Sequence, residues 1–238
     1  MLSLSGQANP THRLVMLLFF FVLANPSLFS QTLTVLHAFD GSDGQYPQAA
    51  LTLDSAGNLY GTTSYGGAGY GTIFKLDPEG NYSVLYRFAG GPNDGAYPGA
   101  LVRDTAGNLY GTTSQGGTAS DGTLFKLDAS GNETVLHNFG ANSSDGMEPN
   151  SGLIQDRAGN LYGTTVTGGL YNGGTAFEWT VAGKEKVLFN FDGLGSGGMW
   201  PGAGSLLPAK IGVLGTTAFG GTSNLGTLFS LGKSTVPT

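Results

Sequence analysis

The sequence has no cysteine and few charged residues. Cysteine is absent from all 238 residues, and 11% of the residues are charged, which is less than half of the usual share of about 25%. The absence of cysteine excludes disulfides, thiolate nucleophiles, cysteine zinc sites and lipid attachment through cysteine. No basic run is present to neutralise phosphates, and the net charge is −6. Nucleic acid is therefore excluded as the expected partner.

Glycine, in contrast, is abundant, with 42 residues. It does not recur at every third position, so a collagen helix is excluded. Hydrophobic residues make up 39% of the chain and aromatic residues 11%, which is enough to build a core. A chain that is rich in glycine, threonine and aromatic residues favours β-strands joined by tight turns, and we expect an all-β fold.

The first thirty residues have the composition of a signal peptide. His12 and Arg13 precede the apolar run 14–23, and Ser30-Gln31 offers a cleavage point. Ten apolar residues are too few to span a bilayer as a helix. We therefore expect residues 1–30 to be a signal peptide and residues 31–238 to be one exported domain without a transmembrane anchor, in the periplasm, at the cell surface or outside the cell. An uncleaved N-terminal anchor or a misassigned start codon is the alternative.

A hexapeptide recurs with a period of about 50 residues, which is typical of stacked supersecondary units. Its copies are NLYGTT at 58–63, 108–113 and 160–165, and GVLGTT at 212–217. The first repeat predicts four strands, at 50–53, 58–63, 71–76 and 82–88, separated by turns that contain Asp, Pro and Gly. Four antiparallel strands per period predict a β-propeller of four blades.

The strand pattern also predicts how the ring closes. Residues 32–39 resemble the fourth strand of a repeat, and the last repeat provides only three strands. We expect residues 32–39 to complete the last blade beside residues 226–231, because closure removes exposed sheet edges. The alternative is half of an eight-bladed assembly. The chain is accordingly expected to be a monomer or a ring-completing homodimer.

The run VLYRFAGGPNDGAYPGALVRDTAGNLYGTTSQGG, followed by GTLFKLD, resembles the tandem repeat of the GloVer ("choice-of-anchor") family. The resemblance extends over residues 32 to about 232. It implies an exported, β-propeller-like protein of unassigned biochemical role, often with a C-terminal anchor segment. Residues 233–238 contain neither a hydrophobic tail nor a cysteine, and the chain has fewer repeats than the family pattern. The resemblance provides no catalytic residues.

The variable loops on one rim are the expected binding surface, since function usually lies on loops above a rigid scaffold. Tyr46, Tyr97 and Trp200 each precede a proline there, and Glu148 occupies the same repeat position. Exposed aromatic rings stack on sugar rings, so these four residues are candidate ligand-binding residues. Packing between blades is the alternative role of the aromatic side chains.

Three aspartates of the same loops, Asp43, Asp94 and Asp145, are candidate metal ligands. Carboxylates around one axis can hold Ca²⁺, and no other cofactor is expected. The alternative is that each aspartate bonds to the backbone of its own loop, as recurring structural residues do.

The sequence predicts no catalytic residues. His37 and His137 lie on predicted fourth strands, away from the loop rim, so no Ser–His–Asp set is available on that rim. We expect a binding or scaffold module of the cell envelope, with a polysaccharide or an envelope protein as partner. The alternatives are a glycan hydrolase or lyase, and a structural repeat fragment without its own activity.

Overall fold

A computed structural model describes residues 32–193, 197–202, 204, 206–209 and 212–232. The chain divides into two compact units, residues 1–35 and 36–238. The predicted signal peptide and residues 233–238 lie outside the described residues. In the described part, no helix is long and apolar enough to cross a membrane.

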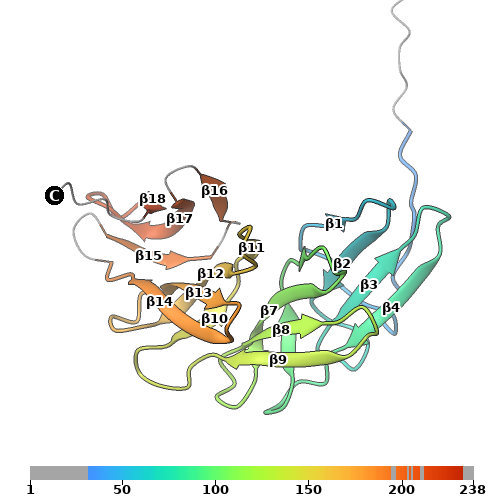
Figure 1. Ribbon diagram of the computed structural model, residues 1–238, viewed down its shortest axis with the longest axis horizontal. Coiled ribbons are helices and arrows are strands. Elements are labelled where there is room, and N and C mark those ends of the chain that lie inside the picture. Colours follow the sequence, from blue (N-terminus) through green and yellow to red (C-terminus); the bar gives the residue numbers. More distant parts are fainter. Residues whose placement is uncertain (1–31, 194–196, 203, 205, 210–211, 233–238) are drawn as a thin grey trace, which may run out of the picture. The chain divides into compact units, whose positions relative to one another are not determined.

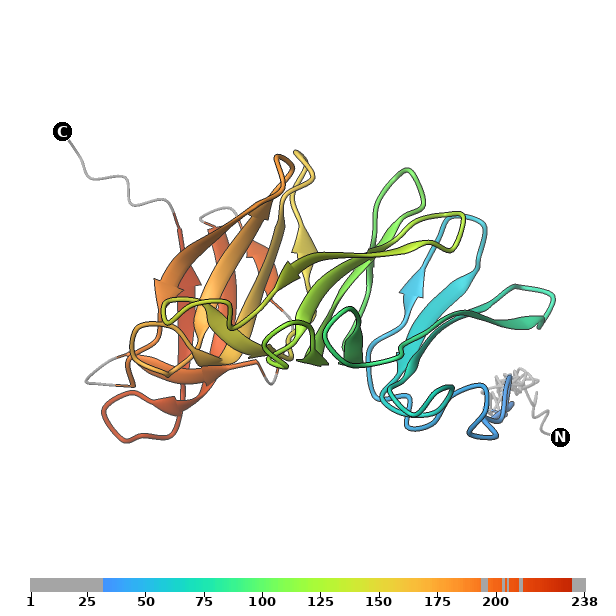
Figure 2. The same cartoon turned by 90° about the horizontal axis from the view of Figure 1, so that it is seen from below.

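The described chain folds into four antiparallel sheets, whose strands lie side by side in Figures 1 and 2. The first sheet contains β1 (Thr52–Leu53), β2 (Leu59–Thr63), β3 (Thr72–Leu76) and β4 (Tyr82–Arg87). The second contains β5 (Gly95–Pro98), β6 (Val102–Arg103), β7 (Leu109–Gly116), β8 (Thr123–Leu127) and β9 (Glu133–Asn138). The third contains β10 (Gly146–Pro149), β11 (Ile154–Gln155), β12 (Leu161–Gly168), β13 (Thr175–Thr180) and β14 (Lys184–Asn190). The fourth contains β15 (Gly198–Pro201), β16 (Leu207–Ala209), β17 (Gly212–Gly220) and β18 (Thr227–Leu231).

The four strands predicted for the first repeat are confirmed as β1 to β4. The loops predicted before each proline differ from the structure. Three of them contain a short strand, namely β5, β10 and β15. These strands form because the hexapeptide strand continues past its Thr-Thr pair. Gly95, for example, pairs with Gly116 at the end of β7.

The repeated glycine of the hexapeptide lies where two side chains cross it. A Cβ on Gly111 would lie 2.6 Å from Cζ of Phe125 and 3.0 Å from Cδ2 of Leu101. Its φ is not positive, so the position requires glycine for space. The second threonine after this glycine is hydrogen-bonded across the sheet, with 2.8 Å between the hydroxyl oxygens of Thr113 and Thr123.

Neighbouring sheets pack face to face through apolar side chains. Between the first and second sheets, Ile73 and Phe88 meet Leu101 and Phe125 in one buried cluster. The corresponding cluster between the second and third sheets contains Leu124, Phe139, Leu153, Leu161 and Phe177. We call the face of a sheet that contacts the next sheet along the chain its trailing face. We call the face that contacts the previous sheet its leading face.

The strand expected to complete the fourth sheet is not formed in the described residues. Among them, β18 pairs with β17 alone, and residues 32–39 are in no strand. Closure of the ring therefore stays a prediction.

Candidate functional site

The loops bring together four tyrosines, Tyr46, Tyr65, Tyr70 and Tyr97, which we call the tyrosine cluster. The ring centroid of Tyr65 lies 5.8 Å from that of Tyr46 and 4.9 Å from that of Tyr97, and the Tyr70 ring lies 6.5 Å from the Tyr97 ring. Tyr46, Tyr65 and Tyr70 are exposed, and Tyr97 is half-buried. The cluster spans the loops of the first two repeats and presents several aromatic faces to solvent.

All four predicted ligand-binding residues have a left-handed backbone. The φ angles of Tyr46, Tyr97, Glu148 and Trp200 are 56°, 60°, 56° and 58°. This conformation costs a non-glycine residue about 1–2 kcal/mol. It is maintained by hydrogen bonds to the preceding sheet: the Tyr97 amide donates to the Tyr70 carbonyl oxygen at 2.9 Å, and the Trp200 amide donates to that of Gly173 at the same distance. At Tyr97, Glu148 and Trp200, the residue before the proline is thus held by a hydrogen bond to the preceding repeat.

The structure places the other predicted ligand-binding residues elsewhere on the loops. Trp200 packs edge-on against Phe219, with 5.0 Å between centroids, and both rings are exposed. Glu148 is exposed, and its amide donates to the Asp121 carbonyl oxygen at 2.8 Å. In the described residues no ring contact joins Trp200 to the tyrosine cluster.

The sequence interpretation missed Tyr65, Tyr70 and Phe219. A signal for two of them was present, because Tyr65 and Phe219 each lie two residues after the hexapeptide of their repeat. Tyr70 has no such signal, since Asp121 and Gly173 replace it in the next repeats.

The three predicted metal ligands lie in separate loops, and each accepts a hydrogen bond from the backbone of its own loop. The donors are the amides of Asp40 for Asp43, Ala89 for Asp94 and Ala141 for Asp145. In the described residues these aspartates do not form a three-ligand group with one another. The geometry thus favours the alternative role, in which each aspartate orders its own loop.

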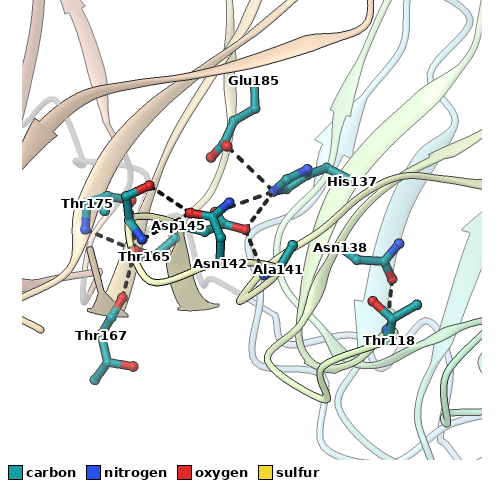
Figure 3. A network of polar contacts seen from close by, with 11 residues as sticks. Thr118, His137, Asn138, Ala141, Asn142, Asp145, Thr165, Thr167, Thr175 and Glu185 are labelled. Atoms are coloured by element: carbon teal, nitrogen blue, oxygen red, sulfur yellow. Dashed lines mark hydrogen bonds and ion pairs between the residues drawn. The ribbon is translucent and has the colours of Figure 1, made fainter. Parts of the chain in front are cut away.

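A different group of three potential ligands forms around Asp145 (Figure 3). Nε2 of His137, on β9, lies 3.2 Å from a carboxylate oxygen of Asp145 and 3.6 Å from one of Glu185, on β14. The three ligand atoms lie within 4.8 Å of one another. The Asp145 side chain is buried, and the other two are mostly buried. Such a set can share protons, and its donor atoms are of the kind that bind divalent cations.

The electrostatics of this group favour bound protons. Burial and the neighbouring Asp145 carboxylate raise the pKa of Glu185, and its Oε1 atom is buried without a partner in the described residues. Burial alone would lower the pKa of His137, but the hydrogen bond to Asp145 and the charge of Glu185 outweigh it and raise that pKa. His137 and Glu185 therefore both bind a proton more tightly than they would in water.

Equivalent repeat positions also meet, with different residues, at two other junctions: the first between residues 37–43 and the first sheet, and the second between the first and second sheets. At the first junction, His37 lies 2.7 Å from the Asp43 carboxylate and stacks on Tyr82 with 3.7 Å between centroids. At the second, the Tyr86 hydroxyl donates to Asp94 at 3.1 Å, and burial together with Asp94 raises the pKa of Glu133 to about 7. The aspartate is common to all three junctions while its neighbours vary. This pattern fits a structural role for the aspartate.

These observations define a class of protein: an all-β chain built from four similar antiparallel sheets, with aromatic side chains on its variable loops. The chain belongs to the Gloeobacter/Verrucomicrobia repeat family, whose model matches residues 68–237. The resemblance seen in the sequence is thereby confirmed. No curated protein matches the chain.

Many solved structures are similar to the chain, among them a lyase and a lactonase. A streptogramin B lyase is 15% identical with a TM-score of 0.46, over 77% of this chain and 54% of the lyase. A gluconolactonase from Xanthomonas campestris is 18% identical with a TM-score of 0.45, over 76% of this chain and 62% of the lactonase. The chain thus spans between half and two thirds of the length of these proteins.

Proposed function

We propose that this protein is an exported binding module of the cell envelope that binds glycans through the tyrosine cluster. The observation that supports the proposal is the contact series Tyr46–Tyr65–Tyr97–Tyr70 on the loops. Aromatic rings that are exposed and contact one another offer flat apolar faces beside polar hydroxyls, which is the chemistry that sugar rings require.

Preorganisation strengthens this proposal. The Tyr97 backbone is fixed by its amide hydrogen bond to Tyr70, so two rings of the cluster come from segments that hold each other. Binding to a surface that is already ordered loses less conformational entropy. Trp200 and Phe219 form a second, smaller aromatic pair, to which we assign an accessory contact.

The proposal includes a finer description of the fold. The four sheets are the blades of a β-propeller, and the edge of the last sheet is completed by residues 32–39. Closure within one chain gives four blades, and closure between two copies gives eight. The export signal in residues 1–30 is part of the same proposal, and it predicts that the protein from its native host has a new N-terminus near residue 31.

Binding to a panel of soluble polysaccharides, measured by calorimetry, tests the proposed function. We expect Tyr65→Ala and Tyr97→Ala each to weaken binding about 3- to 10-fold, since a ring contact contributes about 0.5–1.5 kcal/mol. Tyr171→Ala is the matched control, because Tyr171 is an exposed loop tyrosine outside the cluster. Circular dichroism verifies that each variant is folded.

Two results would overturn the proposal. The first is binding to no polysaccharide of the panel by the folded protein. The second is release of sugars that Glu148→Gln abolishes, which would identify a glycan hydrolase or lyase.

A further inference from the structure

One apolar position of the repeat is buried in three sheets and exposed in the fourth. Ile73 and Leu124 are each 0% exposed and Ala176 is 1% exposed, whereas Leu228 of β18 is 77% exposed. These residues pair with the equivalent residues of the hexapeptide strand: Ile73 with Thr62, Leu124 with Thr112 and Leu228 with Thr216. The trailing face of the fourth sheet therefore has an apolar residue at the same position as the others, but nothing covers it in the described residues.

The first sheet has the reciprocal feature on its leading face. Leu101, Leu153 and Leu206 are 5%, 4% and 6% exposed, whereas the equivalent Leu51 is 56% exposed. An apolar cavity of about 360 Å³ lies over this face, and its lining includes Leu36, Phe39, Leu51, Leu59, Phe74 and Leu76. In the second sheet the equivalents of Leu51 and Leu59, which are Leu101 and Leu109, are buried against the first sheet. Phe74 and Leu76 are already buried, as are their equivalents Phe125 and Leu127, so the open part of the leading face lies around Leu51.

The two open faces are complementary, because every internal junction joins such faces. At each internal junction, the phenylalanine that ends one repeat packs on a phenylalanine of the next sheet: Phe88 on Phe125, Phe139 on Phe177, and Phe191 on Phe229. Phe39 packs on Phe74 in the same way, with 5.4 Å between centroids. The end of the predicted closing strand is thus already seated on the first sheet, as the last strand of a preceding sheet would be.

We propose that the open leading face of one copy of this chain is covered by the open trailing face of a second copy. Residues 33–38 of the first copy then pair antiparallel with β18 of the second. A second copy is the occupant because, among the residues that the structure describes, the chain's own β18 pairs with β17 alone while Leu36 and Leu228 are both exposed. The proposal rests on the proposed fold and is independent of glycan binding.

The repeat also sets the register of this contact. Lys75 pairs with Ser83, Lys126 with Thr134, and Glu178 with Lys186. The equivalent pair across the new junction is Ser230 with Thr34. The contact joins two different surfaces, so it either closes into a ring of copies or continues as an open chain of copies.

Cysteine cross-linking tests the proposal without interference, since the natural sequence contains no cysteine. Directly paired residues have Cβ atoms about 4.5–5.5 Å apart, close to what a disulfide spans. Full-length Thr34→Cys and Ser230→Cys variants are mixed and oxidised, and we expect a covalent heterodimer. The control mixture pairs Thr34→Cys with Ser130→Cys, an exposed turn residue of the second sheet. In this control mixture, the amount of covalent heterodimer should remain at background.

The double variant with both cysteines distinguishes the two modes of closure. Covalent dimers or larger species support the contact between copies. A cross-linked monomer would overturn the proposal in favour of closure within one chain, and no cross-link in either experiment would overturn it as well.

Light scattering provides a second readout. We expect the unmodified chain at micromolar concentration to have at least twice the mass of one chain, and Leu228→Asp to reduce it to that of one chain. Leu170→Asp changes an exposed loop leucine and should leave the mass unchanged. A folded, unmodified protein that remains a single chain would contradict the proposal.

Discussion

Leu228 and Ile73 occupy the same position of the repeat, yet Leu228 is exposed where Ile73 is fully buried. The difference comes from what lies beside each strand. The β3 strand, which contains Ile73, is paired with β4 and faces the second sheet, whereas β18 has neither neighbour in the described residues. The exposure of this one apolar residue thus identifies the surface of the fold that is not covered in the described residues.

Gly111→Ala should lower the free energy of unfolding by about 1–3 kcal/mol, because an added methyl group would overlap the Phe125 ring and Leu101. Gly99→Ala is the control, since its nearest neighbours would be 3.7 Å away. Urea unfolding measures both. Equal losses in the two variants would show that glycine is not required for space at position 111.

Thr113→Val should cost about 1–3 kcal/mol, because the buried amide and hydroxyl groups of Thr123 lose their partner. Thr134→Val, at an exposed position of β9, should be nearly neutral. The denaturation midpoints of the two variants provide the comparison, and a neutral Thr113→Val would contradict this interpretation of the pair.

Glu133→Gln should change how stability depends on pH. Burial and Asp94 raise the pKa of Glu133 from 4.5 to about 7, so between these values the folded state binds the proton more tightly than the unfolded state. This contribution is fully present below pH 4.5 and is lost as the pH rises through 7. The variant should lose less stability than the natural protein between pH 5 and 8.

Thermal unfolding across this range is the measurement for Glu133→Gln. Glu79→Gln alters an exposed glutamate and serves as the control. If the natural protein and Glu133→Gln had parallel profiles, the raised pKa would be excluded as the cause.

Glu148→Gly should stabilise the protein by about 1 kcal/mol, because glycine adopts a φ of 56° without the steric cost that a side chain has. Glu148→Ala removes the same carboxylate but keeps the Cβ, so it should give no such gain. Chemical denaturation of the pair separates backbone strain from charge, and equal stabilities would show that position 148 carries no strain.

The repeat allowed β1 to β4 to be predicted, because period, turn residues and hexapeptide all agree in the first repeat. Short strands such as β5 were not predicted, since their pairing depends on where Gly95 meets Gly116 in space. The left-handed backbone of Tyr97 was not predicted either, and its amide donates to the Tyr70 carbonyl oxygen of the preceding repeat, a contact that its local sequence does not reveal.

The group formed by His137, Asp145 and Glu185 was not predicted for the same reason. The sequence places His137 on a predicted fourth strand and Asp145 among the candidate metal ligands, and it does not connect the two. Glu185 was not noticed, because it joins them only when β14 lies beside the preceding loop. The sequence of a single repeat therefore could not predict the contacts that residues of neighbouring sheets make in this site.

Hydrogen–deuterium exchange as a function of protein concentration tests the central claim most directly. If a second copy covers the last sheet, peptides containing residues 32–38 and 227–231 should become protected together as the concentration rises. The peptide containing β8 should be protected at every concentration. Protection of both edge peptides that does not change with concentration would contradict the account.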